Sequence, residues 1–234
     1  MSPPHESVVQ PPRDICTPSW TQDFLERFRH HLALKIIAVS AFMAVFFNGY
    51  FSALEDAQQR AYEMPLLALD HWLPFEPWAI VPYLSLWFYV GIVPGLMLNW
   101  RSISLYGVWA TVLCALGLTI FRLWPTEVPI RLPPDVQAWG FSLLKGLDAP
   151  ANACPSLHVA GTVLTALWLH RLLGWITAPV GLKMLNALWA LAIIWSTMAT
   201  RQHVALDVLG GVCLGLAVSI PSLWLHPNLG RYRA

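Results

Sequence analysis

Long apolar runs alternate along the chain with short polar stretches. A helix that crosses a bilayer needs about 20 consecutive, mostly apolar residues. Six runs reach or approach that length, and we expect each of them to form a membrane-spanning helix. They cover approximately residues 32–54, 78–98, 104–124, 155–176, 183–199 and 204–225. The pattern therefore predicts an all-α, polytopic membrane protein built as a bundle of six transmembrane helices.

Two segments outside these runs have a weaker apolar pattern. Residues 19–31 place an aromatic side chain at every fourth position with charged residues beside it, which predicts an amphipathic helix lying on the membrane surface. Residues 55–77 are acidic and contain three prolines, and we expect a short interfacial helix near residues 64–72. In the last run, Gly211 and Gly215 form a GxxxG pair, which indicates close packing between helices.

Composition supports the membrane assignment. Of the 234 residues, 56% are hydrophobic and only 12% are charged, so one soluble core could not bury the apolar surplus. The formal net charge of +1 provides no basic field for nucleic acid, which we do not expect as a partner. The four cysteines, none in a CxxC or zinc-ligand spacing, are expected to be unpaired packing thiols: Cys16, Cys114, Cys154 and Cys213.

The distribution of Lys and Arg predicts the orientation in the membrane. With six spans both termini lie on one side, and that side collects nine basic residues against five on the other. The positive-inside rule then makes the termini cytoplasmic. We expect a cytoplasmic N-terminal segment at 1–31, a membrane domain at 32–226 and a short cytoplasmic tail at 227–234.

Chemically active residues gather on the opposite, non-cytoplasmic side. The third run ends there, and the fourth and sixth runs begin there, so topology alone brings five polar residues to one membrane face. They are His158, His203, Asp207, Arg131 and Arg201. Topology permits these side chains to converge, and convergence is what a catalytic site would require.

Their spacing suggests phosphoryl transfer. His203 and Asp207 are four residues apart and are expected to share a helix face, where the carboxylate would fix the imidazole tautomer and leave the other nitrogen nucleophilic. His158 would then protonate the leaving oxygen as a general acid. Arginine donors match phosphate oxygens, and a fourth helix beginning near Pro155 would add the positive end of its dipole.

Each element also has a simpler interpretation. A histidine near a helix end is often an interfacial residue, and an i,i+4 His–Asp pair can be a plain helix-surface pair. Asp207 is harder to explain in that way, because it lies about one turn inside an apolar run and needs a partner there. A His/Asp metal site is an alternative, as is a non-enzymatic transporter or haem-binding bundle, which a Soret band without phosphate release would favour.

Two short motifs resemble the type 2 phosphatidic acid phosphatase superfamily of lipid phosphatases and phosphotransferases. They are Pro155-Ser-Leu-His158 and Ser196-x6-His203-x3-Asp207, where the family has P-S-G-H and S-R-x5-H-x3-D. Leu157 replaces the usual glycine, and Thr197 stands where the family's arginine would be. The stretches at 148–160 and 124–131 look closest to the inositol phosphorylceramide synthase-like branch.

The resemblance implies a mechanism. His203 would form a phosphohistidine, Asp207 would orient it, and His158 would protonate the departing alcohol. The substrate would be a membrane lipid phosphate, and either water or a second alcohol would accept the phosphoryl group. The family needs no metal or other cofactor. Phosphate binding is assigned to Arg131, Arg201, Ser156 and Asn152.

Overall fold

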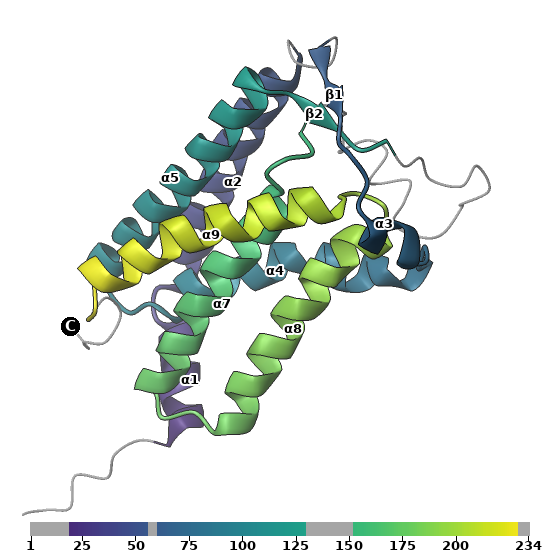
Figure 1. The fold of residues 1–234 in the computed structure, drawn as a ribbon. Helices are drawn as coiled ribbons and strands as arrows, with labels where there is room; N and C mark the ends of the chain where they lie inside the picture. The colour runs from purple at the N-terminus through teal and green to yellow at the C-terminus, as the bar shows by residue number, and fades with distance from the viewer. Residues whose placement is uncertain (1–18, 56–59, 130–151, 229–234) are drawn as a thin grey trace, which may run out of the picture.

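A computed structural model describes residues 19–55, 60–129 and 152–228, and these residues are mostly helical (Figure 1). The elements run, in chain order, as α1 Trp20–Arg29, α2 Leu32–Glu55, β1 Tyr62–Glu63, α3 Ala68–Trp72, the 3-10 helix η2 Pro77–Ala79, α4 Ile80–Leu96, α5 Trp100–Leu123, β2 Thr126–Glu127, α7 Leu157–Trp175, α8 Val180–Ala199 and α9 Ala205–Leu225.

Five helices in the described part of the chain are long and apolar enough to cross a membrane. They are α2, α4 together with η2, α5, α8 and α9. The chain is therefore a multi-pass membrane protein by the length and composition of its helices. The fourth predicted span, residues 155–176, corresponds to α7, which does not belong to this apolar set, and so a six-span topology remains a prediction.

α7 is less apolar because it is enclosed by other helices. It packs against α9, α8, α4 and α5, and α9 crosses it in Figure 1. Its Trp168 is fully buried in the main hydrophobic core and donates to the Ser222 hydroxyl of α9 at 2.9 Å. Arg171 donates to the Leu223 carbonyl of α9 at 2.6 Å. A helix surrounded by protein can carry polar groups, provided that its neighbours satisfy them.

The helix ends follow local capping chemistry. α1 begins with a capping box in which Ser19 and Gln22 bond to each other's backbone amides. The chain turns at His31, where φ is 55°, and α2 begins at Leu32 as predicted. α5 begins at Trp100, four residues before the predicted start, because the Asn99 side chain accepts from the Ser102 amide at 2.8 Å.

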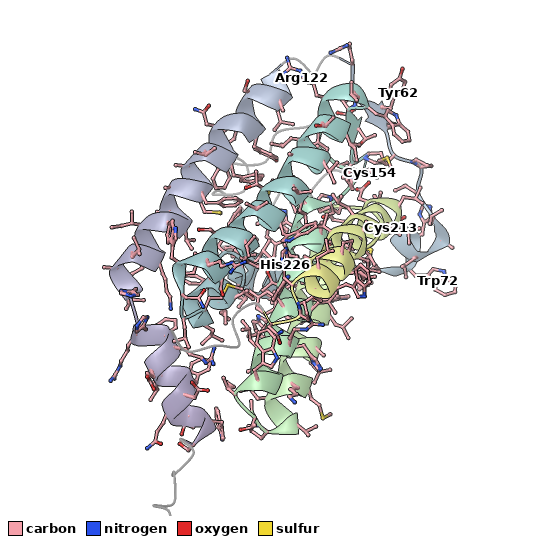
Figure 2. The ribbon with its side chains drawn as sticks, turned by 90° about the vertical axis from the view of Figure 1, so that its left-hand side faces the viewer. Tyr62, Trp72, Arg122, Cys154, Cys213 and His226 are labelled. Carbon is pink, nitrogen blue, oxygen red and sulfur yellow. The ribbon has the colours of Figure 1, made fainter. Side chains whose placement is uncertain are left out.

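The structure contains one short strand pairing that the all-α prediction did not include. β1 and β2 form a two-residue parallel ladder, with Tyr62 opposite Thr126, and Thr126 also bridges to Asn152. Tyr62 and Arg122 therefore lie at the same end of the bundle (Figure 2). The interfacial helix expected near residues 64–72 is only partly correct, since helix is confined to α3, whose Trp72 projects away from the bundle (Figure 2).

The GxxxG pair of α9 lies against α7, as predicted. A Cβ placed on Gly211 would lie 2.5 Å from the Ser156 carbonyl oxygen and 2.8 Å from the Val159 Cβ. One placed on Gly215 would lie 2.7 Å from the Val163 Cβ. These distances are too short for any side chain, so only glycine permits this separation of the two helices.

Gly211→Ala is therefore expected to destabilise the protein. Overpacking typically costs about 1–3 kcal/mol, and thermal unfolding in detergent should report it as a lower Tm. Gly91→Ala in α4 is the matched control, because a Cβ there meets nothing within 4 Å. An equal loss of Tm in both variants would contradict the proposed close contact.

Candidate active site

His203 lies in the turn between α8 and α9. Helix α8 ends in a Schellman motif: the Gln202 amide donates to the Thr197 carbonyl at 3.0 Å and the Arg201 amide to the Met198 carbonyl at 2.9 Å. Arg201 occupies the left-handed position with φ 61°. The His203 amide also donates to the Thr197 carbonyl, at 3.0 Å. The backbone at His203 is thus held by the end of α8.

The prediction that His203 and Asp207 share a helix face is wrong. α9 begins at Ala205, so His203 precedes the helix and only Asp207 lies in its first turn. The reason is a cap: Oδ2 of Asp207 accepts from the Val204 amide at 2.9 Å and keeps residue 204 extended. The same oxygen lies 3.5 Å from Nδ1 of His203, so the two side chains meet by another route.

Asp207 is positioned to act on the imidazole. Its side chain is fully buried, and its Oδ1 has no hydrogen-bond partner among the described residues. The 3.5 Å separation from His203 is longer than a hydrogen bond, and catalytic contacts of this kind often tighten only when substrate binds. With Nδ1 turned to Asp207, Nε2 is the ring nitrogen on the opposite side.

His158 lies in the first turn of α7 and faces the same place. Its ring stacks on Tyr83 of α4 at a centroid distance of 4.6 Å and meets the edge of Trp87 at 5.8 Å. The rings of His158 and His203 are 6.0 Å apart. The Nε2 atom of His158 is buried, and no described residue forms a hydrogen bond with it. The structure thus brings the two histidines and Asp207 together.

The starts of α7 and α9 are bonded to each other. The Ser156 amide donates to the Asp207 carbonyl at 3.0 Å. This bond fixes the start of α7, and with it His158, relative to the start of α9, which His203 precedes. Ser156 is the N-cap of α7, and its hydroxyl accepts from the Val159 amide at 3.3 Å. The expectation of a helix starting at Pro155 is therefore off by two residues, because the hydroxyl of Ser156 provides the cap.

The predicted phosphate-binding residues occupy different positions. Asn152 lines the same cavity as the two histidines, and its amide nitrogen contacts the Tyr50 hydroxyl. Ser156 is fully buried in its capping role, and Arg201 donates to the Leu73 carbonyl at 3.2 Å. Neither of these two lines the cavity. Arg131 lies outside the described residues. Phosphate binding by all four stays a prediction.

An apolar cavity of about 320 Å³ extends from the histidines between α2, α4, α5 and α7. His158, His203 and Asn152 are at one end of it. Along α5 its lining reaches from Phe121 back to Trp100, and the walls are mostly aromatic and aliphatic. The candidate site is therefore a polar end to an apolar space inside the bundle.

Cys154 is close to the site but unsuited to nucleophilic chemistry. Burial, followed by the nearby negative charge of Asp207, raises the pKa of its thiol to about 11. A thiol that stays protonated near neutral pH is a weak nucleophile. Among the described residues, no group of three or more His, Cys, Asp or Glu side chains is arranged to hold a metal ion.

Several residues that shape the site were not identified from the sequence. Tyr83 and Trp87, which flank His158, are part of an apolar run and give no signal of their own. Thr126 holds the segment before α7, accepting from the Cys154 amide through its hydroxyl at 2.8 Å and from the Ala153 amide through its carbonyl at 2.9 Å. Asp70 is a buried carboxylate that directly follows the apolar residues Leu66 to Leu69, and a carboxylate at that position was a usable signal.

Comparison with protein families gives a match to the PAP2 superfamily over residues 53–220. The chain belongs to this superfamily. PAP2 proteins are generally phosphatases or phosphotransferases, so membership supports a phosphoryl-transfer enzyme acting on lipid phosphates. The matched region contains both histidines and Asp207. Comparison with curated proteins and with solved structures gave no match.

Substitutions at Asp207 should separate its two roles. Asp207→Asn keeps an oxygen that can accept from the Val204 amide but removes the charge beside His203. We expect little loss of Tm and a fall in phosphoryl-transfer rate of about 100-fold or more. Asp207→Ala also removes the cap and should cost about 1 kcal/mol in addition. Near-normal turnover in Asp207→Asn, measured beside thermal unfolding, would contradict the assigned role.

Proposed function

We propose that this chain is an integral membrane enzyme that takes the phosphoryl group from a lipid phosphate through a phosphohistidine on His203. The observation that carries the proposal is the meeting of His203 with Asp207 and His158 at the polar end of an apolar cavity. A nucleophile, the carboxylate that orients it and a second imidazole for proton transfer are the parts that such a reaction requires.

The reaction proceeds in two steps. Nε2 of neutral His203 attacks the phosphorus, and the bond from phosphorus to the lipid oxygen breaks. Protonated His158 gives its proton to the departing oxygen and becomes neutral. In the second step, neutral His158 removes a proton from water or an alcohol, whose oxygen attacks the phosphohistidine and restores His203. Asp207 stabilises the positive charge that His203 gains in the first step, carries as the phosphohistidine and loses in the second step.

The cavity supports a lipid as the substrate. Its lining along α5 spans residues 100–121, or about 30 Å at the helical rise of 1.5 Å per residue. That length is comparable to the hydrocarbon thickness of a bilayer, about 30 Å. An apolar space of this depth suits a hydrocarbon chain, while the histidines at its end meet the phosphate.

The acceptor and the membrane face are further parts of the proposal. The branch resemblance favours transfer to a second alcohol, as in inositol phosphorylceramide synthases, and water is the other acceptor. The excess of basic residues on the side of the termini supports an active site on the non-cytoplasmic face. The proposed chemistry uses only side chains of this protein.

An assay over a panel of lipid phosphates tests this function. Purified protein is expected to convert at least one lipid, with loss of about 1,000-fold or more in His203→Ala and a smaller loss in His158→Ala. Labelling with a ³²P-lipid should trap an acid-labile phosphoenzyme in wild type and none in His203→Ala. Free phosphate as product indicates hydrolysis, and a new headgroup lipid indicates transfer.

His170→Ala is the matched control, because His170 is an exposed histidine at the other end of α7. It should retain wild-type turnover and labelling. Full activity in both His203→Ala and His158→Ala would contradict the catalytic assignment. A Soret band in purified protein that converts no lipid would instead support the haem-binding alternative.

Filling the cavity should change which lipids are used. Gly161 lies one turn below His158 and lines the cavity, where its Cβ position is 4.0 Å from Val90. Gly161→Leu would occupy the path of a hydrocarbon chain, so we expect kcat/KM to fall at least about 10-fold for long-chain lipid phosphates, since steric misplacement is costly. Short-chain substrates should be affected less.

Gly181→Leu in α8 is the control for this variant, because nothing lies within 4 Å of a Cβ there. It is expected to leave the chain-length profile unchanged. A Gly161→Leu enzyme with the wild-type profile across chain lengths would show that the hydrocarbon chain binds elsewhere.

A further inference from the structure

A second buried carboxylate holds the start of α9. Asp70, in the short helix α3, is only 5% exposed, and within the described part of the chain its hydrogen bonds come from two backbone amides. Its Oδ1 accepts from the Ala205 amide at 2.8 Å, across a separation of 135 residues. Its Oδ2 accepts from the Leu67 amide at 2.8 Å. Asp70 thus joins the segment before α4 to the first residue of α9.

The same segment contacts the turn on both sides of His203. Before it, the Glu76 amide donates to the Ala199 carbonyl at 3.0 Å, and the Arg201 side chain donates to the Leu73 carbonyl at 3.2 Å. After it, Asp70 accepts from the Ala205 amide. Residues 67–76, which we term the α3 strap, therefore bond to three residues on either side of His203. All three of these residues lie within the short stretch 199–205.

At the start of α9, each of the two carboxylates accepts a hydrogen bond from a different backbone amide. The first amides of a helix have no partner within the helix and need other acceptors. Asp207 accepts from Val204 and Asp70 accepts from Ala205. Without Asp70, the Ala205 amide becomes an unsatisfied donor two residues from Asp207. The Asp207 carboxylate would then be drawn toward Ala205 and away from Nδ1 of His203.

We propose that Asp70 is a positioning residue for the phosphoryl-transfer site: by satisfying the Ala205 amide, it leaves the carboxylate of Asp207 directed at His203. This inference rests on the proposed function for its effect on rate. Its effect on the His203 ring is independent of any substrate. Asp70 is outside the cavity lining and acts only through Asp207 and the turn.

The effect of Asp70 on the rate of phosphoryl transfer is tested by single-turnover conversion of ³²P-dioctanoyl phosphatidic acid in detergent micelles. The enzyme is in excess over the substrate, at concentrations where adding more enzyme no longer raises the observed rate constant. Under this condition, misfolded protein lowers the active fraction without changing the rate constant. We expect Asp70→Ala to lower the rate constant about 10- to 100-fold, as displacement of a catalytic group does. Steady-state KM should stay within about threefold of wild type, because uniform binding is untouched.

Two variants complete the comparison. Asp70→Asn keeps one acceptor oxygen and should give a rate constant between those of wild type and Asp70→Ala. Asp23→Ala removes the carboxylate that binds Arg27 at 3.0 Å in α1, at the other end of the chain's fold, and should leave the rate constant unchanged. An unchanged rate constant in Asp70→Ala would overturn the proposal. A fall in the rate constant that is equally large in Asp70→Ala and in Asp23→Ala would also overturn it.

A second measurement does not need activity. In protein labelled with ¹⁵N-histidine, the resonance assigned to His203 by its loss in His203→Ala should show the Nδ1-protonated tautomer. In Asp70→Ala we expect a mixture of tautomers. An identical His203 signal in both proteins would overturn the proposal. A wild-type protein that converts no lipid, yet shows this change, would contradict the proposed function and support the positioning role.

Discussion

The amides at the start of α9 have to be satisfied away from bulk water, and the arrangement of the site depends on how this is done. A helix start leaves several amides without partners, and such groups are costly when buried in a membrane protein. Here two carboxylates provide the acceptors, one from the helix itself and one from a segment far away in sequence. The charge that caps the helix is also the charge beside His203. The carboxylate that caps the helix is therefore the one to which the proposed mechanism assigns the orientation of His203.

The second constraint is the distance between α7 and α9. Because Gly211 and Gly215 have no side chain, the two helices approach closely enough for the Ser156 amide to reach the Asp207 carbonyl. This bond relates the first turn of α7 to the first turn of α9, and the imidazoles of His158 and His203 stand 6.0 Å apart as a result. A wider helix separation would keep both histidines but lose their relation to each other.

The sequence predicted well what depends on local pattern. Apolar runs located the helices within a few residues, because lipid exposure and core packing both demand long apolar segments. The order of the runs placed His158 and His203 at one end. The sequence did not predict that His203 precedes α9, because a cap from Asp207 and a helical i,i+4 pair have nearly the same spacing. Nor could it identify Tyr83 or the strand pairing of Tyr62 with Thr126, since both are contacts between distant segments.

The polar character of α7 has a consequence for how the protein is made. A helix that contains two histidines, an arginine and two threonines gains less by entering lipid by itself than a fully apolar helix does. Its Trp168 and Arg171 find their partners on α9, which is synthesised about 50 residues later. We therefore expect α7 to insert stably only together with α8 and α9. Assembly of the site is then expected to be a late and cooperative event that requires α9 to have been synthesised.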